Sequence, residues 1–198
     1  MQDDNIRAFI AIELPDDIRK ELARLQEQMA AWHEPNIKLV APESLHLTLK
    51  FLGNVATHRL PELEKGLETA TSQSQPFKLE LDALGAFPNH RHPEIIWCGL
   101  KGNMAQLMQL QRMIEVCLLR LNFPEETRPF SPHLTLARLR REIDAKPSEN
   151  LMAKLGESIF TEDLSFTIEG LSLMQSRLTP KGAVHTKLAE FTFTSAVK

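Results

Sequence analysis

The chain has 198 residues, of which 42% are hydrophobic and 25% are charged, and its formal net charge at pH 7 is −3. This composition is that of a soluble globular protein long enough for one full core. The negative charge argues against a protein that coats long nucleic acids, because such a protein needs a broad basic face. Recognition of an RNA end or a small nucleotide remains open.

The sequence also argues against secretion and membrane insertion. The start of the chain, MQDDN, lacks the basic and apolar regions of a signal peptide, and the apolar runs are too short to cross a bilayer. The two cysteines, Cys98 and Cys117, show no CxxC spacing and indicate reduced, buried thiols. We therefore expect a cytoplasmic protein.

The first half of the chain predicts five elements in the order strand, helix, strand, helix, strand. Apolar residues at helical spacing follow Pro15, and a second helical pattern covers residues 58–71. Strand-like runs stand before, between and after these helices. The three predicted strands cover residues 9–14, 45–51 and 77–81.

The second half of the chain predicts the same five elements. They are a strand at 96–101, a helix opened by Asn103, a strand at 133–136, a helix at 148–155 and an extended stretch at 166–171. A turn signal, TPKG, then leads into a terminal strand at residues 183–193. The stretch between the halves, residues 85–93, is rich in turn formers, and we expect it to be an exposed link.

This order indicates a gene duplication, with repeat 1 at about residues 6–90 and repeat 2 at about residues 94–198. Helices that cover one face of each sheet leave the other faces to meet. The duplicated β-α-β-α-β unit therefore predicts an α+β fold, a single bilobal domain over residues 1–198. Its two pseudo-twofold-related lobes, with antiparallel sheets, would enclose a central cleft.

One eight-residue motif occurs twice, 87 positions apart. Residues 42–49 are PESLHLTL and residues 129–136 are PFSPHLTL. Because side chains alternate along a strand, the histidine and threonine of each copy share a face, and the two leucines face the core. The cleft residues are then His46, Thr48, His133 and Thr135, and the core residues are Leu47, Leu49, Leu134 and Leu136.

Two imidazoles and two hydroxyls that meet in one cleft suit the hydrolysis of a cyclic phosphodiester. One imidazole takes a proton from water while the other gives one to the departing oxygen, and histidine titrates near neutral pH. Threonine hydroxyls can donate hydrogen bonds to the phosphate oxygens. This scheme needs no metal ion or other cofactor.

Two other functions compete with this hypothesis. A single strand histidine is usually a surface residue, but two with threonine at +2 in duplicated strands are hard to explain by packing. A non-catalytic RNA- or nucleotide-binding module on the same scaffold is disfavoured by the intact second motif. A metal-dependent phosphoesterase could use His90 and His92, but two histidines in a loop are a weak metal signal.

Several single residues carry weaker predictions. Lys50 has cleft parity, whereas Phe51 is expected to pack in the core although it could stack a base. Arg138 lies five residues after His133, so it reaches the cleft only if the strand has a bulge or ends before it. Surface positions are expected for the single histidines His33, His58 and His185.

The paired motifs resemble the 2H phosphoesterase superfamily, and within it the bacterial and archaeal RNA 2′,3′-cyclic phosphodiesterases, also known as 2′-5′ RNA ligase-like proteins. The resemblance rests on HLTL at 46–49 and 133–136. It is supported by RAFIAI at 7–12, FLG at 51–53 and RPF at 128–130. It covers nearly the whole chain, from about residue 6 to residue 193.

This resemblance implies metal-independent hydrolysis of RNA 2′,3′-cyclic phosphate ends to 2′-phosphate, with 2′-5′ RNA ligation as related reverse chemistry. It implies that His46 is the proton donor, that His133 is the proton acceptor and that Arg138 contacts phosphate. The residues alone leave the acid and base roles open. The expected partners are RNA ends or small nucleotides with a 2′,3′-cyclic phosphate; no obligate protein partner is indicated, and we expect a monomer.

Overall fold

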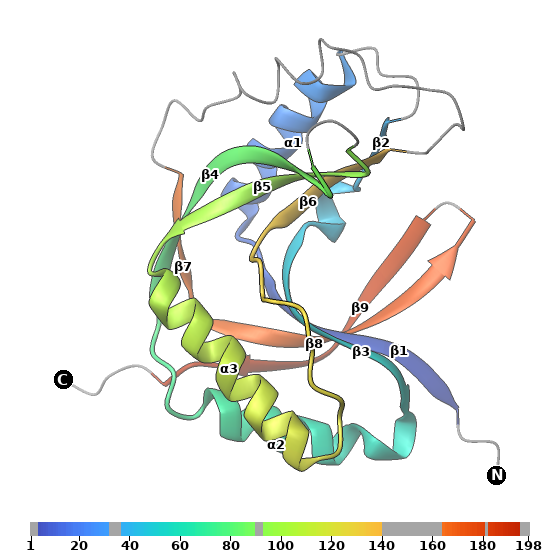
Figure 1. Ribbon diagram of the computed structural model, residues 1–198, viewed down its shortest axis with the longest axis vertical. Coiled ribbons are helices and arrows are strands. Elements are labelled where there is room, and N and C mark those ends of the chain that lie inside the picture. Colours follow the sequence, from blue (N-terminus) through green and yellow to red (C-terminus); the bar gives the residue numbers. More distant parts are fainter. Residues whose placement is uncertain (1–3, 32–36, 90–92, 140–163, 181, 195–198) are drawn as a thin grey trace.

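The computed structural model describes residues 4–31, 37–89, 93–139, 164–180 and 182–194. In the first half, the predicted order of strand, helix, strand, helix, strand is confirmed (Figure 1). These elements are β1 (Asn5–Glu13), α1 (Asp16–Ala30), β3 (His46–Ala56), α2 (Leu60–Thr71) and β4 (Phe77–Phe87). Between them lie a short strand and two 3₁₀ turns: β2 (Ile37–Leu39), η1 (Pro42–Ser44) and η2 (Thr57–Arg59).

The described elements of the second half follow the predicted order with one correction. Its described elements are β5 (Ile95–Gly102), α3 (Met104–Arg120), β6 (Leu134–Leu139), β7 (Ser165–Ile168), β8 (Gly170–Thr179) and β9 (Gly182–Thr192). The helix predicted at 148–155 lies outside the described residues. The stretch predicted at 166–171 is extended, but it is divided between two strands, because the chain moves there from pairing with β4 to pairing with β1. A Cβ at Gly170 would lie 2.4 Å from the carbonyl oxygen of Phe191, so this crossing requires glycine.

The described strands form an antiparallel sheet in the order β7-β4-β5-β6-β3-β1-β8-β9, with β2 paired to β6 (Figure 1). Its two halves join between β3 and β6 through a single residue pair, Leu47 with Leu134. These leucines are the same position of the two motifs. An approximate twofold axis therefore passes between them, and each motif lies where the two halves meet.

The two repeats exchange strands across this axis. β4, from the first repeat, pairs with β5, and β8, from the second repeat, pairs with β1. Each half of the sheet therefore contains strands from both repeats, which the order of the elements did not indicate. The exchange brings residues near the C-terminus beside the first motif.

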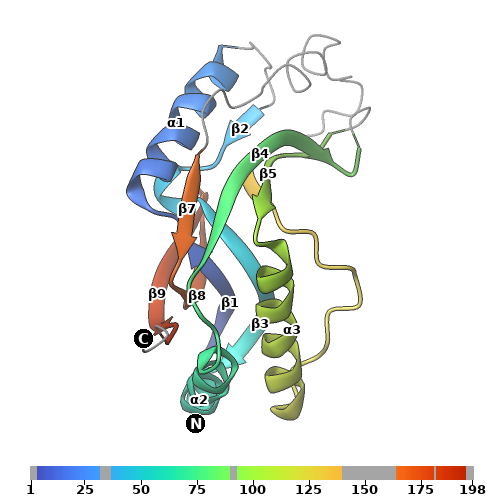
Figure 2. The same ribbon diagram turned by 90° about the vertical axis from the view of Figure 1, so that its left-hand side faces the viewer.

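The helices also contact strands of the other repeat. α1 lies by β2 and β6, where buried Gln26 donates hydrogen bonds to the carbonyls of Val40 (2.7 Å) and Leu136 (2.9 Å). α2 and α3 pack together at the opposite end of the molecule, beside β3 (Figures 1 and 2). One hydrophobic cluster runs beneath both motifs and includes the buried Cys98 and Cys117. In the part of the chain that is described, no helix has the length and hydrophobicity to cross a bilayer.

Candidate active site

The two motif histidines stand at the start of two neighbouring strands. His46 is the first residue of β3, and His133 immediately precedes β6. The motif leucines are almost completely buried, as strand alternation predicts, while the histidines and threonines are partly exposed on the other face. The pair Leu47–Leu134 brings the two histidines to opposite sides of the twofold axis.

Both imidazoles are held by the same hydrogen bond. Nδ1 of His46 lies 2.7 Å from the carbonyl oxygen of Ser44, and Nδ1 of His133 lies 2.7 Å from that of Ser131. A carbonyl oxygen can only accept, so in each ring Nδ1 carries the hydrogen. In the neutral ring Nε2 is then a free acceptor, and in the charged ring it becomes a donor. Each histidine can therefore accept or donate a proton through Nε2.

A β-bulge lies at the last residue of each motif. Leu49 in β3 and Leu136 in β6 have no partner residue where the register shifts. A bulge reverses the alternation of side chains beyond it. This reversal turns Ala137 to the core and Arg138 to the face of His133, so the bulge that Arg138 requires is present and its side chain is exposed.

The same reversal makes two predictions on β3 wrong. Lys50 does not face the cleft: its ammonium is buried and lies 2.6 Å from Glu115 on α3 and 2.8 Å from the carbonyl oxygen of Pro124. Phe51 does not pack in the core, because it is 65% exposed, with its ring centroid 6.2 Å from that of Phe9.

Aromatic rings from other strands of the sheet contact each motif histidine. The His46 ring lies 4.9 Å from Phe9 and 5.2 Å from His185 between ring centroids. The His133 ring lies 5.0 Å from Phe87 and 6.3 Å from Trp97. These contacts restrict the ring positions, which favours proton transfer at a fixed place.

Two of these neighbours were not expected at the site. Residues 85–87 were predicted to be part of an exposed link, but they extend β4, and Phe87 packs on His133. His185 was predicted to lie at the surface, but it is partly buried and contacts His46 and Phe9. No sequence motif marks His185, and only the pairing of β9 with β8 and of β8 with β1 brings it here.

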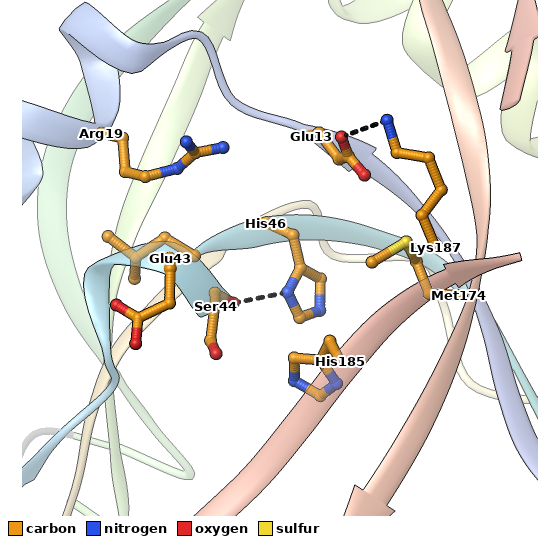
Figure 3. A pocket seen from close by; sticks show the side chains of 9 residues that line it. Glu13, Arg19, Glu43, Ser44, His46, Met174, His185 and Lys187 are labelled. Carbon is orange, nitrogen blue, oxygen red and sulfur yellow. Dashed lines mark hydrogen bonds and ion pairs between the residues drawn. The ribbon is translucent and has the colours of Figure 1, made fainter.

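A pocket of about 220 Å³ opens beside His46 (Figure 3). On one side, Lys187 lies 2.8 Å from Glu13, and on the other Arg19 bonds Asp16 at 2.7 Å. The pocket therefore combines cations with carboxylates next to one motif histidine. Its lining residues are Glu13, Arg19, Glu43, Ser44, Leu45, His46, Met174, His185 and Lys187.

Burial makes the proton affinity of His46 low. It lowers the pKa of His46 to about 4, and the nearby His185 and His133 act in the same direction. The hydrogen bond to Ser44 and the carboxylate of Glu13 oppose this shift. Burial also lowers the pKa of His185. At neutral pH the ligand-free protein therefore holds His46 as a neutral ring.

The other sequence candidates lie away from this site or outside the described residues. His58 is exposed in η2, as predicted. His33 and the pair His90 and His92 lie outside the described residues, so the loop considered for metal binding is not described. Within the described ranges, no three or more side chains of His, Cys, Asp and Glu are grouped as metal ligands would be.

The chain is similar to known proteins over most of its length. Residues 14–179 match the family model of the 2′-5′ RNA ligase superfamily. Proteins named RNA 2′,3′-cyclic phosphodiesterase from Methanothermobacter thermautotrophicus and Methanocaldococcus jannaschii are 31% and 34% identical over 186 residues. Each alignment covers 94% of this chain, with 98% and 100% of the relatives' lengths.

Solved structures share the whole fold. The crystal structure of TT0787 from Thermus thermophilus has a TM-score of 0.78 and 28% identity, covering 97% of this chain and 100% of that chain. Escherichia coli LigT in complex with 3′-AMP has a TM-score of 0.74 and 26% identity over the same shares. With the family model matching most of its length, this chain belongs to the 2′-5′ RNA ligase superfamily.

Proposed function

We propose that this protein is an RNA 2′,3′-cyclic phosphodiesterase that opens the cyclic phosphate at the 3′ oxygen and leaves a 2′-phosphate end. The observation that carries the proposal is the matched pair of imidazoles. His46 and His133 come from equivalent positions, each has Nδ1 fixed by a carbonyl, and they flank one twofold axis. The names of the relatives from two archaea support the same reaction.

The paired geometry suits an in-line displacement at phosphorus. Water attacks from one side while the 3′ oxygen departs from the opposite side, so the base and the acid must stand on opposite sides of the phosphate. Two histidines related by a twofold axis meet this requirement. By resemblance to the family, His133 takes the proton from water and His46 gives one to the 3′ oxygen.

The acid role of His46 requires a proton that its ring lacks in the ligand-free protein. Its pKa is lowered to about 4, so the ring is neutral at pH 7. A phosphate diester brings a negative charge close to Nε2, and an opposite charge at this distance favours the protonated ring. We infer that His46 becomes protonated together with substrate binding. Hydrolysis then returns the proton taken from water by His133 to the solvent.

The neighbouring polar residues have roles in binding. Thr48 and Thr135 share the face of the histidines, so their hydroxyls can donate to the non-bridging oxygens. Arg138, turned to that face by the bulge, adds a positive charge for the phosphate. The same site would accept small nucleotides with a 2′,3′-cyclic phosphate, and 2′-5′ RNA ligation would use related chemistry in reverse.

The test is hydrolysis of an oligonucleotide with a 2′,3′-cyclic phosphate end in the presence of EDTA, with identification of the product end. Wild-type protein should yield a 2′-phosphate. His46→Ala and His133→Ala should each lose on the order of 10²–10⁴-fold in kcat, the usual contribution of a positioned acid or base. The double variant should lose little more than either single one, because the two act as a unit.

His58→Ala is the matched control, because it removes an exposed histidine away from the motifs. It should keep wild-type activity. Binding of the cyclic end without turnover would identify a binding module instead of an enzyme. Loss of activity on chelation, or a 3′-phosphate product, would contradict the mechanism.

A further inference from the structure

The two motif histidines have equivalent backbone surroundings but are required to do different work. Each begins or precedes a motif strand, and each bonds the carbonyl of the serine two residues before it at 2.7 Å. Nothing in these shared features separates an acid from a base. The difference must come from residues that the duplication did not copy.

Across the ranges that the structure describes, only one of the two motif histidines, His46, is in contact with a ring that can itself take up a proton. His133 is contacted by Phe87 and Trp97, which carry no charge in the physiological range. His46 is contacted by Phe9 and by a second imidazole, His185, at 5.2 Å and an interplanar angle of 84°. Phe9 and His185 also touch each other at 5.0 Å, so the three rings form one cluster. His185 belongs to β9, the terminal strand, which follows the five elements that the second half shares with the first.

We propose that His185 is a positioning residue for His46: it packs edge-on against the His46 ring, which it holds beside Phe9, and protonation of one of the two imidazoles opposes protonation of the other. The functional meaning of this inference rests on the proposed phosphodiesterase activity. The coupling between the two rings does not depend on that activity.

The cluster is built so that both imidazoles cannot be charged together in the ligand-free protein. Nδ1 of His185 is buried and has no hydrogen-bond partner among the described residues. A neutral ring tolerates this nitrogen as a bare acceptor, whereas a charged ring would leave a buried N–H unbonded. Two like charges at this separation also repel, so the pair titrates as a coupled system.

Other charged groups near His46 do not cancel this effect. Glu13 on β1 attracts a proton to His46, but its carboxylate is already bound by Lys187 at 2.8 Å. Lys187 itself bonds Glu190 at 3.0 Å, and its positive charge lies on the same pocket wall (Figure 3). Among the described residues, the pocket lining also includes Arg19 from α1 and Glu43 from η1 at the exposed rim, and His133 acts on His46 from across the twofold axis.

The experiment measures the titration of the His46 ring by NMR in the ligand-free protein, for wild type, His185→Phe and His185→Gln. Phenylalanine keeps a ring in the cluster but removes the charge, and glutamine removes the charge while keeping a polar group. Both variants should raise the pKa of His46 by about one unit, the scale of a strongly coupled pair. His58→Phe, which removes an exposed histidine, should leave the His46 titration unchanged.

The pH dependence of kcat/KM should move in the same direction as the His46 titration in both variants. A residue that only packed against His46 would change activity or stability without moving this profile. An unchanged His46 titration in both variants would overturn the inference. If the His46 titration depends on His185 but the protein does not hydrolyse cyclic phosphates, only the proposed function is refuted. If the protein hydrolyses cyclic phosphates but the His46 titration does not depend on His185, only the role of His185 is refuted.

Discussion

The buried imidazole of His46 makes the stability of the protein depend on pH in a way that can be calculated. Its pKa falls from 6.5 in the unfolded chain to about 4 in the folded protein. Between these values the unfolded chain binds more protons than the folded one, so stability is lost as the pH falls from 6.5 towards 4. This loss of stability is absent at pH values above the pKa of the unfolded chain, and it is complete at pH values below the pKa of the folded protein.

The size of this loss follows from the two pKa values. For one group with these values, the folded protein should lose about 2 kcal/mol between roughly pH 8 and roughly pH 5. His46→Phe keeps an aromatic ring but cannot be protonated, so this part of the loss should disappear. The remaining pH dependence comes from groups that both proteins share, including His185, and the comparison between them largely removes it.

The assay is urea unfolding of both proteins at the two pH values, with free energies obtained from the linear dependence on denaturant. We expect the wild type to lose about 2 kcal/mol more than His46→Phe on going to the lower pH. His58→Phe serves as the control for the loss of a histidine. Equal losses in the wild type and His46→Phe would refute the argument, because His46 would then not be held as a neutral ring.

Two further predictions concern the face of the site and the core behind it. Thr48→Val and Thr135→Val should each weaken transition-state binding by roughly 1–3 kcal/mol, seen as a lower kcat/KM, because a hydrogen bond to a charged oxygen is lost. Their melting temperatures should stay unchanged, and a large drop with normal activity would mean core positions instead. Lys50→Met should destabilise folding by up to about 3 kcal/mol in urea unfolding, because the largely buried Glu115 would be left without its cation. Adding Glu115→Leu should recover most of that loss, and no recovery would show that the ion pair is not the cause.

The polar faces of the motif strands could be predicted because alternation is a local property. Leu47 and Leu134 are buried, and the histidine next to each lies on the open face, as period two requires. The repeated motif also predicted two equivalent histidine positions, 87 residues apart along the chain. The comparison with relatives then agrees with the family resemblance.

The residues just beyond each motif could not be predicted in the same way. A bulge at Leu49 sends Lys50 into the core and Phe51 into solvent, the opposite of what unbroken alternation predicts. A bulge depends on the pairing of two strands, and a single strand's sequence does not report it. The same is true of Arg138, for which the sequence could only state that a bulge or a strand end was needed.

Sequence by itself determined the duplication, the α+β class, the two motifs and the side chains on their open face, because these depend on composition and on the period of each element. Tertiary structure alone decided that the repeats exchange β4 and β8, and that the joint at Leu47 and Leu134 places the two histidines about one axis. It also decided that His185 reaches His46 from a strand 139 positions later. The physical reason is that strand pairing and ring contact join residues across the chain, while a sequence pattern records only neighbours along it.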